Sequence, residues 1–242
     1  MSNPPQNFLA KGENVNYSNH AVLDLFAGTG VGVACQQLGV VEHGVEKMPA
    51  AQATRKANGM GLAYDDVWDI EKAENLQFDT LWASPPCQTF SVAGKGDGRK
   101  ALTEVLEAIK TLRWTDMESL RKLGEEVGDE RTALVLTPLA YVNKFMPTYV
   151  AFEQVPAVLP VWEGCAAVMR DLGYSVWVGY LHAEQYGVPQ TRKRAYLIAR
   201  SDGKDAAPPT PTHSKYYSRH PERLDIGVKK WVSMAEGLAN AT

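Results

Sequence analysis

A buried-strand pattern that runs directly into a glycine turn limits the possible folds of this chain more than any other feature. Residues 21–26 are apolar apart from one aspartate, which predicts a strand inside a sheet. The turn Ala27-Gly28-Thr29-Gly30 follows, and a helix is expected over residues 31–38. A second strand over 41–46 and a helix that begins at Pro49 complete a strand–helix–strand unit. Such a unit is typical of parallel sheets with helical connections.

The alternation of strand and helix patterns continues to about residue 200. Further strands are expected over residues 80–83, 149–152, 174–181 and 195–199, and further helices over 134–145 and 158–172. The sequence therefore predicts an α/β fold with a mostly parallel sheet and helices on both faces. Because ligands of such sheets bind at the carboxyl ends of the strands, that edge is the expected place for a site.

Composition excludes several classes of protein. The 242 residues include three cysteines without the spacing of a zinc site or the density of a disulfide scaffold, so no metal site is predicted. No apolar run approaches the roughly 20 residues that span a bilayer, and we expect a soluble, cytoplasmic protein without a membrane partner. The net charge of −3 does not favour nucleic acid, but from Lys193 onward nine basic residues stand against five acidic ones. Any contact with DNA is expected there.

Polar residues stand at the ends of three expected strands. The glycine turn lets backbone amides approach a ligand, although a turn that merely joins a strand to a helix would show the same pattern. Glu46 ends the second strand, where a carboxylate can accept both hydroxyl hydrogens of a ribose. Asp66 follows a third expected strand, placed to accept from an adenine amino group. These residues predict an adenosine site, without distinguishing S-adenosylmethionine from a dinucleotide.

Cys87 differs from the other cysteines because two prolines precede it. Pro85 and Pro86 fix the backbone and remove competing donors, so the thiol is held in one direction at a strand end. A free cysteine is more often a small buried hydrophobe, and that is expected for Cys35 and Cys165 in their helical segments. The surroundings of Cys87 favour a nucleophile.

Four motifs, in order along the chain, resemble those of the DNA (cytosine-5)-methyltransferase family. The cofactor motif resembles residues 24–30, the nucleophile motif Pro86-Cys87-Gln88 with Phe90-Ser91, the acid motif Phe152-Glu153-Gln154-Val155, and the basic motif Gln190-Thr191-Arg192-Lys193-Arg194. A weaker resemblance covers Asp129-Glu130-Arg131 with Leu134. Gln154 departs from the family pattern, which usually has asparagine there. The resemblance implies a Rossmann-like methyltransferase fold that uses S-adenosylmethionine.

The implied reaction is methylation of carbon 5 of a cytosine flipped out of double-stranded DNA. Cys87 is the expected nucleophile, which adds to ring carbon 6 and places carbanion character on carbon 5. Glu153 is the expected acid at ring nitrogen 3. Arg194, with Arg192 behind it, is expected to supply positive charge toward the base oxygen, although both arginines also fit a solvated strand edge.

The resemblance also implies a wider set of site residues. Those expected to bind the cofactor are Asp24, Phe26, Ala27, Gly28, Thr29, Gly30, Glu46, Lys47, Asp66, Val67, Pro86 and Leu134. Those expected to bind the substrate are Gln88, Ser91, Arg99 and Gln190. The glycine-rich loop over residues 94–99 is a candidate to close over the flipped base.

The expected organisation has three parts. Residues 1–19 form an N-terminal lead, residues 20–200 form the catalytic domain, and residues 201–242 form a linker and the start of an incomplete target-recognition region. Because the family normally continues into a complete recognition domain, a separately encoded C-terminal piece is an expected partner beside DNA.

Three alternatives remain open from the sequence. The first is a non-catalytic remnant or a subunit of a split methyltransferase. The second is a dinucleotide-dependent oxidoreductase, for which Gly28, Gly30 and Gly32 do not supply the fuller Gly-x-Gly-x-x-Gly pattern. The third is a tRNA methyltransferase of the same family.

Overall fold

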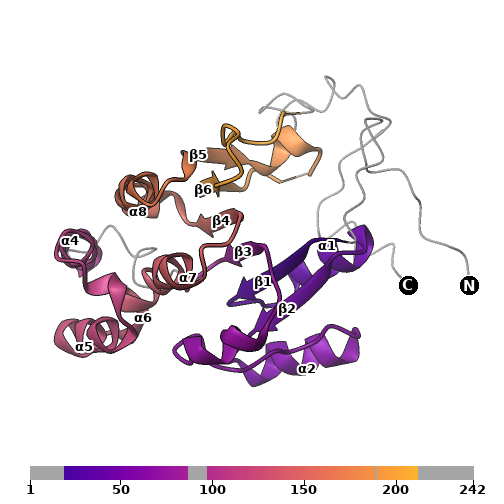
Figure 1. The fold of residues 1–242 in the computed structure, drawn as a ribbon, viewed down its shortest axis with the longest axis horizontal. Helices are drawn as coiled ribbons and strands as arrows, with labels where there is room; N and C mark the ends of the chain where they lie inside the picture. The colour runs from indigo at the N-terminus through magenta and orange to yellow at the C-terminus, as the bar shows by residue number, and fades with distance from the viewer. Residues whose placement is uncertain (1–18, 87–96, 189, 212–242) are drawn as a thin grey trace, which may run out of the picture.

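The computed structural model describes residues 19–86, 97–188 and 190–211, with residues 97–99 described by their backbone alone (Figure 1). Three of the expected site residues, Cys87, Gln88 and Ser91, therefore lie outside the described residues. The same holds for the side chain of Arg99 and for residues 94–96 of the glycine-rich loop, whereas residues 97–99 begin a helix. The expected roles of all four residues stay predictions.

Within the described residues, six strands form one sheet in the order β2-β1-β3-β4-β6-β5. They are β1 (Ala21–Leu25), β2 (Val41–Val45), β3 (Thr80–Ala83), β4 (Tyr149–Gln154), β5 (Ser175–His182) and β6 (Lys193–Arg200). The first four strands run parallel, whereas β6 runs antiparallel to both of its neighbours. The predicted α/β class is confirmed, and these strands begin and end within two residues of the expected positions.

The helices lie on both sides of the sheet, as expected. They are α1 (Gly30–Leu38), α2 (Pro49–Ala57), α4 (Asp97–Lys110), α5 (Met117–Val127), α6 (Glu130–Leu134), α7 (Thr137–Phe145) and α8 (Leu159–Asp171), with short 3-10 helices η2 (Ile70–Asn75), η3 (Arg113–Thr115), η4 (Pro156–Val158) and η5 (Ala183–Tyr186). In Figure 1, α4 to α8 gather on one side of the strands, whereas α1 and α2 lie beside β1 and β2. The helix expected over 134–145 begins anew at α7 because Pro138 in its first turn has no amide hydrogen to continue α6.

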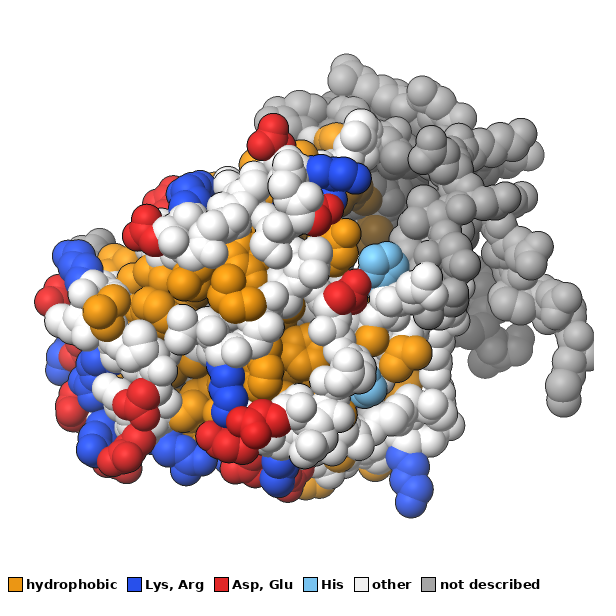
Figure 2. Space-filling view, in the orientation of Figure 1, with side chains coloured by type: hydrophobic (Ala, Val, Ile, Leu, Met, Phe, Trp, Pro, Cys, Tyr) orange, Lys and Arg blue, Asp and Glu red, His pale blue; other side chains and the backbone are white. Residues whose placement is uncertain are grey.

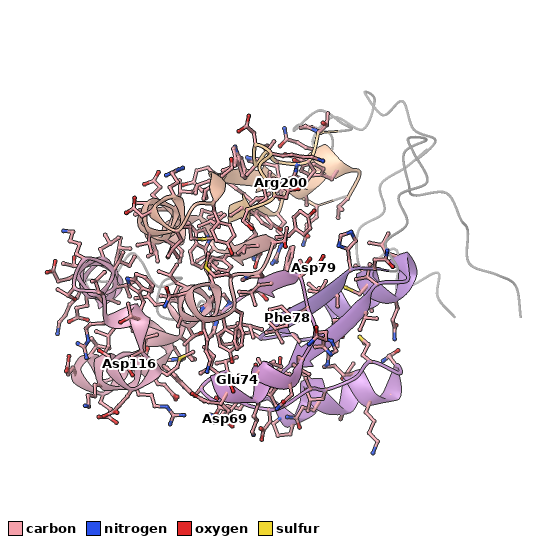
Figure 3. All side chains as sticks on the ribbon, viewed as in Figure 1. Asp69, Glu74, Phe78, Asp79, Asp116 and Arg200 are labelled. Carbon is pink, nitrogen blue, oxygen red and sulfur yellow. The ribbon has the colours of Figure 1, made fainter. Side chains whose placement is uncertain are left out.

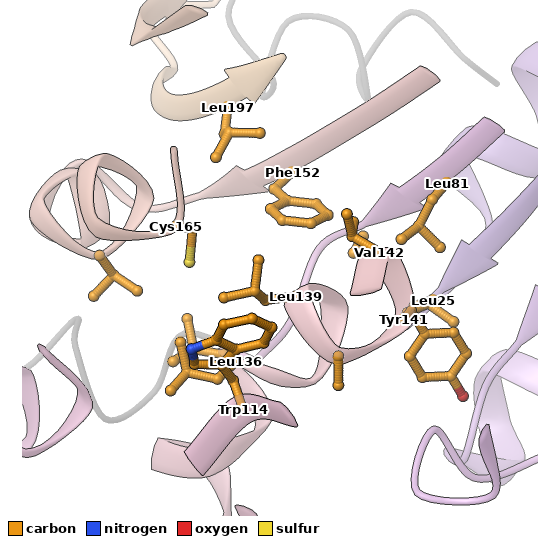
Figure 4. Close-up of a cluster of buried hydrophobic side chains, with 14 of the residues drawn as sticks. Leu25, Leu81, Trp114, Leu136, Leu139, Tyr141, Val142, Phe152, Cys165 and Leu197 are labelled. Carbon is orange, nitrogen blue, oxygen red and sulfur yellow. The ribbon is translucent and has the colours of Figure 1, made fainter. Parts of the chain in front are cut away.

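The main core lies between the sheet and α7 and α8. Alternate residues of neighbouring strands project to the same side, so Leu25, Leu81 and Phe152 face Leu139 of α7 (Figure 4). All four side chains are fully buried. Each such side chain contributes roughly 1.5–3 kcal/mol to folding. This packing fixes the strands whose carboxyl ends carry the candidate site.

The third strand expected before Asp66 is absent from the described residues, which show an isolated parallel bridge between Val45 and Tyr64. The chain then turns, because the Asp66 carboxylate accepts the amide hydrogen of Trp68 at 3.2 Å. An aspartate that bonds to the backbone two residues ahead favours a turn over a longer ladder. The expectation of a strand was therefore wrong, although the bridge leaves Asp66 beside the end of β2.

Charged side chains also lie on two other surfaces, one over α4 and α5 and one at the amino edge of the sheet. Acidic and basic groups are intermixed over α4 and α5, at the lower left of Figure 2. At the amino edge of the sheet, Asp79 pairs with His20, and Arg200 pairs with Asp202 and lies over the Tyr149 ring (Figure 3). In the described part of the chain, no helix is long and apolar enough to cross a membrane.

Candidate active site

The turn after β1 adopts a backbone that few residues tolerate. Phe26 and Gly28 have φ angles of 60° and 45°, in the left-handed region that favours glycine. The Ala27 amide donates to the Val45 carbonyl at 3.0 Å, which joins the turn to the end of β2. A Cβ atom added at Gly28 would meet nothing within 4 Å, so the space above this residue is open. The turn can thus admit a ligand close to its backbone.

Glu46 stands directly after β2 and is held by backbone donors. Its Oε2 accepts the Gly28 amide hydrogen at 2.8 Å, and its Oε1 accepts that of Met48 at 2.7 Å. A carboxylate has about four acceptor positions, so each oxygen keeps one for a further donor. These free acceptor positions fit the hydroxyl hydrogens of the ribose of an adenosine cofactor. The arrangement agrees with the expected role of Glu46.

Asp66 and Lys47 form an ion pair beside Glu46. The Lys47 Nζ lies 2.9 Å from the Asp66 Oδ2. The hydrogen bond from Asp66 raises the pKa of Lys47 above its ordinary value. An adenine amino group that bonds to Asp66 must share this carboxylate with Lys47. Both residues therefore remain candidates for the adenine end of the site.

Three other residues expected at the cofactor occupy different surroundings. The Asp24 side chain is fully buried, and neither carboxyl oxygen accepts a hydrogen bond from the described residues. Val67 is buried, and its carbonyl accepts the Tyr141 hydroxyl hydrogen at 2.8 Å. Leu134 is half-buried and packs against the core. Asp24 lies behind the turn, so any effect it has on the cofactor passes through the turn. Its role at the cofactor stays a prediction.

Glu153 is brought together with both expected arginines. Its Oε1 lies 3.0 Å from Arg192 Nη2 and 3.0 Å from Arg194 Nε. β4 supplies the glutamate and β6 supplies Arg194, because the two strands pair antiparallel with Glu153 opposite Tyr196. The trio combines two cations and one anion, so it favours a ligand with negative charge or electron-rich oxygen. Gln190, by contrast, is exposed before β6.

Gln154 ties the acid-bearing strand to the segment that precedes Cys87. Its side chain is 2% exposed, and its Nε2 donates to the Pro85 carbonyl at 2.6 Å. The Ser84 amide in turn donates to the Leu25 carbonyl at 3.3 Å. Chain segments at the carboxyl ends of β1, β3 and β4 are thereby joined. Pro86, one residue before Cys87, is half-buried at this junction.

A cavity of about 350 Å³ opens beside the Glu153 trio. Its lining is mainly apolar and includes Trp82, Tyr196 and Ile198, while Arg192 and Arg194 form its polar side. Pockets of this size and character commonly receive small organic groups. The cavity extends the candidate site across the sheet face opposite α7.

Solved structures place this fold among methyltransferases. The structure resembles the Dnmt2 methyltransferase of S. pombe with a TM-score of 0.56 and 20% identity, covering 78% of this chain and 53% of that one. It also resembles the Entamoeba histolytica methyltransferase EhMeth with a TM-score of 0.55 and 16% identity, covering 81% of this chain and 57% of that one. The chain thus has the Rossmann-like methyltransferase fold predicted from its sequence.

Residues 20–115 and 119–233 match the C-5 cytosine-specific DNA methylase family, and the chain belongs to that family. It is 27% identical over 177 residues to the type II methyltransferase M.AquIA of Picosynechococcus, with 68% of this chain and 59% of the relative covered. It is 28% identical over 187 residues to M.AplI of Arthrospira platensis, with 75% and 46% covered. The chain thus spans about half the length of these relatives. The family assignment confirms the resemblance that the four sequence motifs indicated.

The described site also contains two residues that sequence patterns missed. Arg55 of α2 and Glu42 of β2 form a buried ion pair beneath the glycine turn. The available signal was Gly44, since an isolated glycine inside a strand often marks the close approach of another group. That signal does not say which group approaches.

Proposed function

We propose that this chain transfers a methyl group from S-adenosylmethionine to carbon 5 of a cytosine flipped out of double-stranded DNA. The observation that carries the proposal is Glu153, held between Arg192 and Arg194 and joined through Gln154 to the backbone just before Cys87. Family membership and the free acceptor positions of the Glu46 carboxylate support it. The cytoplasm of a bacterial or phage-infected cell, where the DNA lies, is the proposed location.

The chemistry follows from the residue types. The Cys87 thiolate forms a bond to ring carbon 6, and the electron pair of the ring double bond moves to carbon 5. Glu153 donates a hydrogen bond or proton at ring nitrogen 3, which stabilises the added electrons. The carbon 5 electron pair then bonds to the electrophilic methyl group that bound S-adenosylmethionine would supply, and the sulfur–methyl bond would break with its electrons left on sulfur, which gives S-adenosylhomocysteine. A base then removes the carbon 5 proton, the double bond re-forms, and the thiolate leaves.

The turn, Glu46 and the arginines orient the reactants. The open turn after β1 and the Glu46 carboxylate hold the cofactor, while Glu153 at the end of β4 holds the base. Flipping the cytosine costs a few kcal/mol, which contacts in the pocket must offset. The cavity lined by Trp82 and Tyr196 offers apolar surface beside the trio.

The test is tritium transfer from labelled S-adenosylmethionine to duplex DNA, with tRNA as the alternative substrate. We expect Cys87→Ser to abolish transfer while cofactor binding, measured by calorimetry, stays close to that of the unmodified chain. Cys35→Ala is the matched control, because burial raises the pKa of the Cys35 thiol to about 11 and makes it a poor nucleophile. Full transfer by the serine variant, or transfer to tRNA alone, would contradict the proposal.

Covalent trapping tests the mechanism more directly. DNA with 5-fluorocytosine at the methylated position cannot lose fluorine as a proton is lost, so the adduct with Cys87 should survive denaturation on a gel. Trapping that persisted in Cys87→Ala would exclude this nucleophile. The separately encoded C-terminal piece stays a prediction, tested by adding the product of the adjacent reading frame to the same assays.

A further inference from the structure

Arg55 is fully buried, although it carries a permanent charge. Its Nη2 lies 2.7 Å from each carboxylate oxygen of Glu42, and its Nη2 and Nε donate to the Gly61 carbonyl at 2.6 and 3.2 Å. Glu42 is itself 6% exposed. A buried pair of this kind persists only where geometry and further hydrogen bonds compensate for desolvation. The structure therefore holds this guanidinium in one defined place.

Gly44 makes room for the guanidinium, and Gly32 makes room for the neighbouring Met60. A Cβ atom at Gly44 of β2 would lie 2.1 Å from Arg55 Nη2 and 2.5 Å from its Cζ. A Cβ atom at Gly32 of α1 would lie 2.5 Å from Met60 Sδ and 3.4 Å from Arg55 Nη1. β2 therefore lacks a side chain where the guanidinium passes, and α1 lacks one where Met60 packs beside it.

The remaining nitrogen reaches the turn. Arg55 Nη1 donates to the Gly28 carbonyl at 3.2 Å, while the Gly28 amide donates to Glu46 Oε2 at 2.8 Å. Gly28 has no side chain and a φ of 45°, so these outside contacts limit its motion. The Gly28 amide thus contacts Glu46, the candidate ribose-binding carboxylate, and the Gly28 carbonyl contacts Arg55, which pairs with Glu42.

We propose that Arg55, anchored by Glu42, is a positioning residue that fixes the Gly28 carbonyl and so holds the turn and Glu46 in the geometry that binds S-adenosylmethionine. The inference rests on the proposed function for the identity of the ligand. Asp24 supports it, because burial first and then the Glu42 charge raise the pKa of Asp24 well above its ordinary value. A protonated Asp24 leaves Arg55 and Glu42 as a balanced pair.

A purely structural pair would stabilise the fold without affecting the ligand, so the test must separate the two roles. The double variant E42L/R55M replaces both charges with apolar groups of similar length, a change that often leaves buried-pair proteins as stable as before. R55K keeps the charge, but one ammonium group cannot reach both Glu42 and Gly28 as the guanidinium does. Arg113→Lys, at an ion pair with Glu126 on α5, is the matched control.

Calorimetry with S-adenosylhomocysteine, with thermal unfolding of each variant, gives the decisive readings. We expect both Arg55 variants to bind about tenfold more weakly, with KM for S-adenosylmethionine raised and kcat at saturation nearly unchanged, as for lost ground-state binding. Arg113→Lys should bind normally. A folded Arg55 variant with unchanged affinity and KM would overturn the positioning role. If the unmodified chain binds the probe yet methylates no DNA, the proposed function fails while this inference stands.

Nuclear magnetic resonance of the unmodified chain provides a second test, which does not depend on whether the two variants fold. In the unmodified chain, the Arg55 guanidinium resonances should exchange slowly with water and shift when S-adenosylhomocysteine binds, whereas those of Arg113 should not shift. Arg55 resonances that are indifferent to the probe would overturn the proposal.

Discussion

Two glutamate–arginine clusters lie on different strands of the same sheet, Glu42 on β2 and Glu153 on β4, and they differ in burial. Glu42 and Arg55 are 6% and 1% exposed, beneath the turn after β1. Glu153 is 14% exposed, while its partners Arg192 and Arg194 are 46% and 25% exposed. A buried pair has all its hydrogen bonds committed to the protein, whereas a half-exposed trio can exchange a partner for a ligand. The same residue types therefore serve positioning in the buried pair and chemistry in the half-exposed trio.

The largest expected effect is on catalysis at the exposed cluster. Glu153→Gln keeps the size and removes the acid, so kcat should fall by about 10²–10⁴, the usual contribution of general acid–base catalysis. The affinity for S-adenosylhomocysteine should change little, because Glu46 follows β2, and β1 and β3 lie between β2 and β4 in the sheet. Glu163→Gln, on the exposed side of α8, is the control. A kcat within threefold of the unmodified chain, roughly 0.6 kcal/mol of barrier, would remove Glu153 from the mechanism.

Breaking the buried cluster should affect stability instead. Glu42→Ala leaves the Arg55 charge buried without its partner, which typically costs 3–5 kcal/mol. Denaturant unfolding should show this loss, while Glu153→Ala should change stability far less because its arginines reach solvent. Equal losses for the two alanine variants would erase the distinction between the clusters.

The hydrogen bond from Gln154 to the Pro85 carbonyl should have an intermediate effect. Gln154→Ala removes the donor to the Pro85 carbonyl in a buried place, which we expect to cost about 1–3 kcal/mol of stability. Gln154→Asn tests the departure from the family pattern, because the shorter side chain must move to reach Pro85. We expect it to lower kcat more than stability, since the backbone before Cys87 loses its support. Unchanged kinetics in both variants would show that the tether has no catalytic role.

The smallest effect concerns pH. A raised folded-state pKa means that native Asp24 keeps a proton that the unfolded chain releases above roughly pH 4, so stability falls as pH rises from there. Asp24→Asn has no proton to hold, so its stability relative to the unmodified chain should increase between about pH 5 and pH 7. Exposed Asp171→Asn is the control. A difference that is constant with pH would show that buried Asp24 is ionised.

Sequence patterns predicted the parts of this molecule that local chemistry decides. Short local patterns predicted β1 from its apolar residues before the glycine turn, β2 before the Glu46 carboxylate, and the extended segment that carries Arg194. All three elements lie where the patterns place them. The strand before Asp66 was predicted wrongly, because the aspartate's own hydrogen bond to Trp68 starts a turn.

The buried pair could not be found in the same way. Arg55 looks like any basic residue in the last turn of an amphipathic helix, and Glu42 like any charged residue in a strand at the edge of a sheet. Their burial arises from the way α2 packs back against β2, a tertiary contact between residues 13 positions apart that neither local pattern records. The Gln154 tether likewise joins segments 69 residues apart.

The glycine in the middle of β2 has a consequence for how this chain can vary. A methyl group at Gly44 would overlap the Arg55 guanidinium, which pairs with Glu42. Substitutions at positions 42, 44 and 55 therefore depend on one another and are tolerated only when they occur together. A library that changes these codons one at a time should recover mainly losses at each. A library that exchanges all three together, with an apolar side chain in place of the charges and alanine at 44, opens sequences that single steps do not reach.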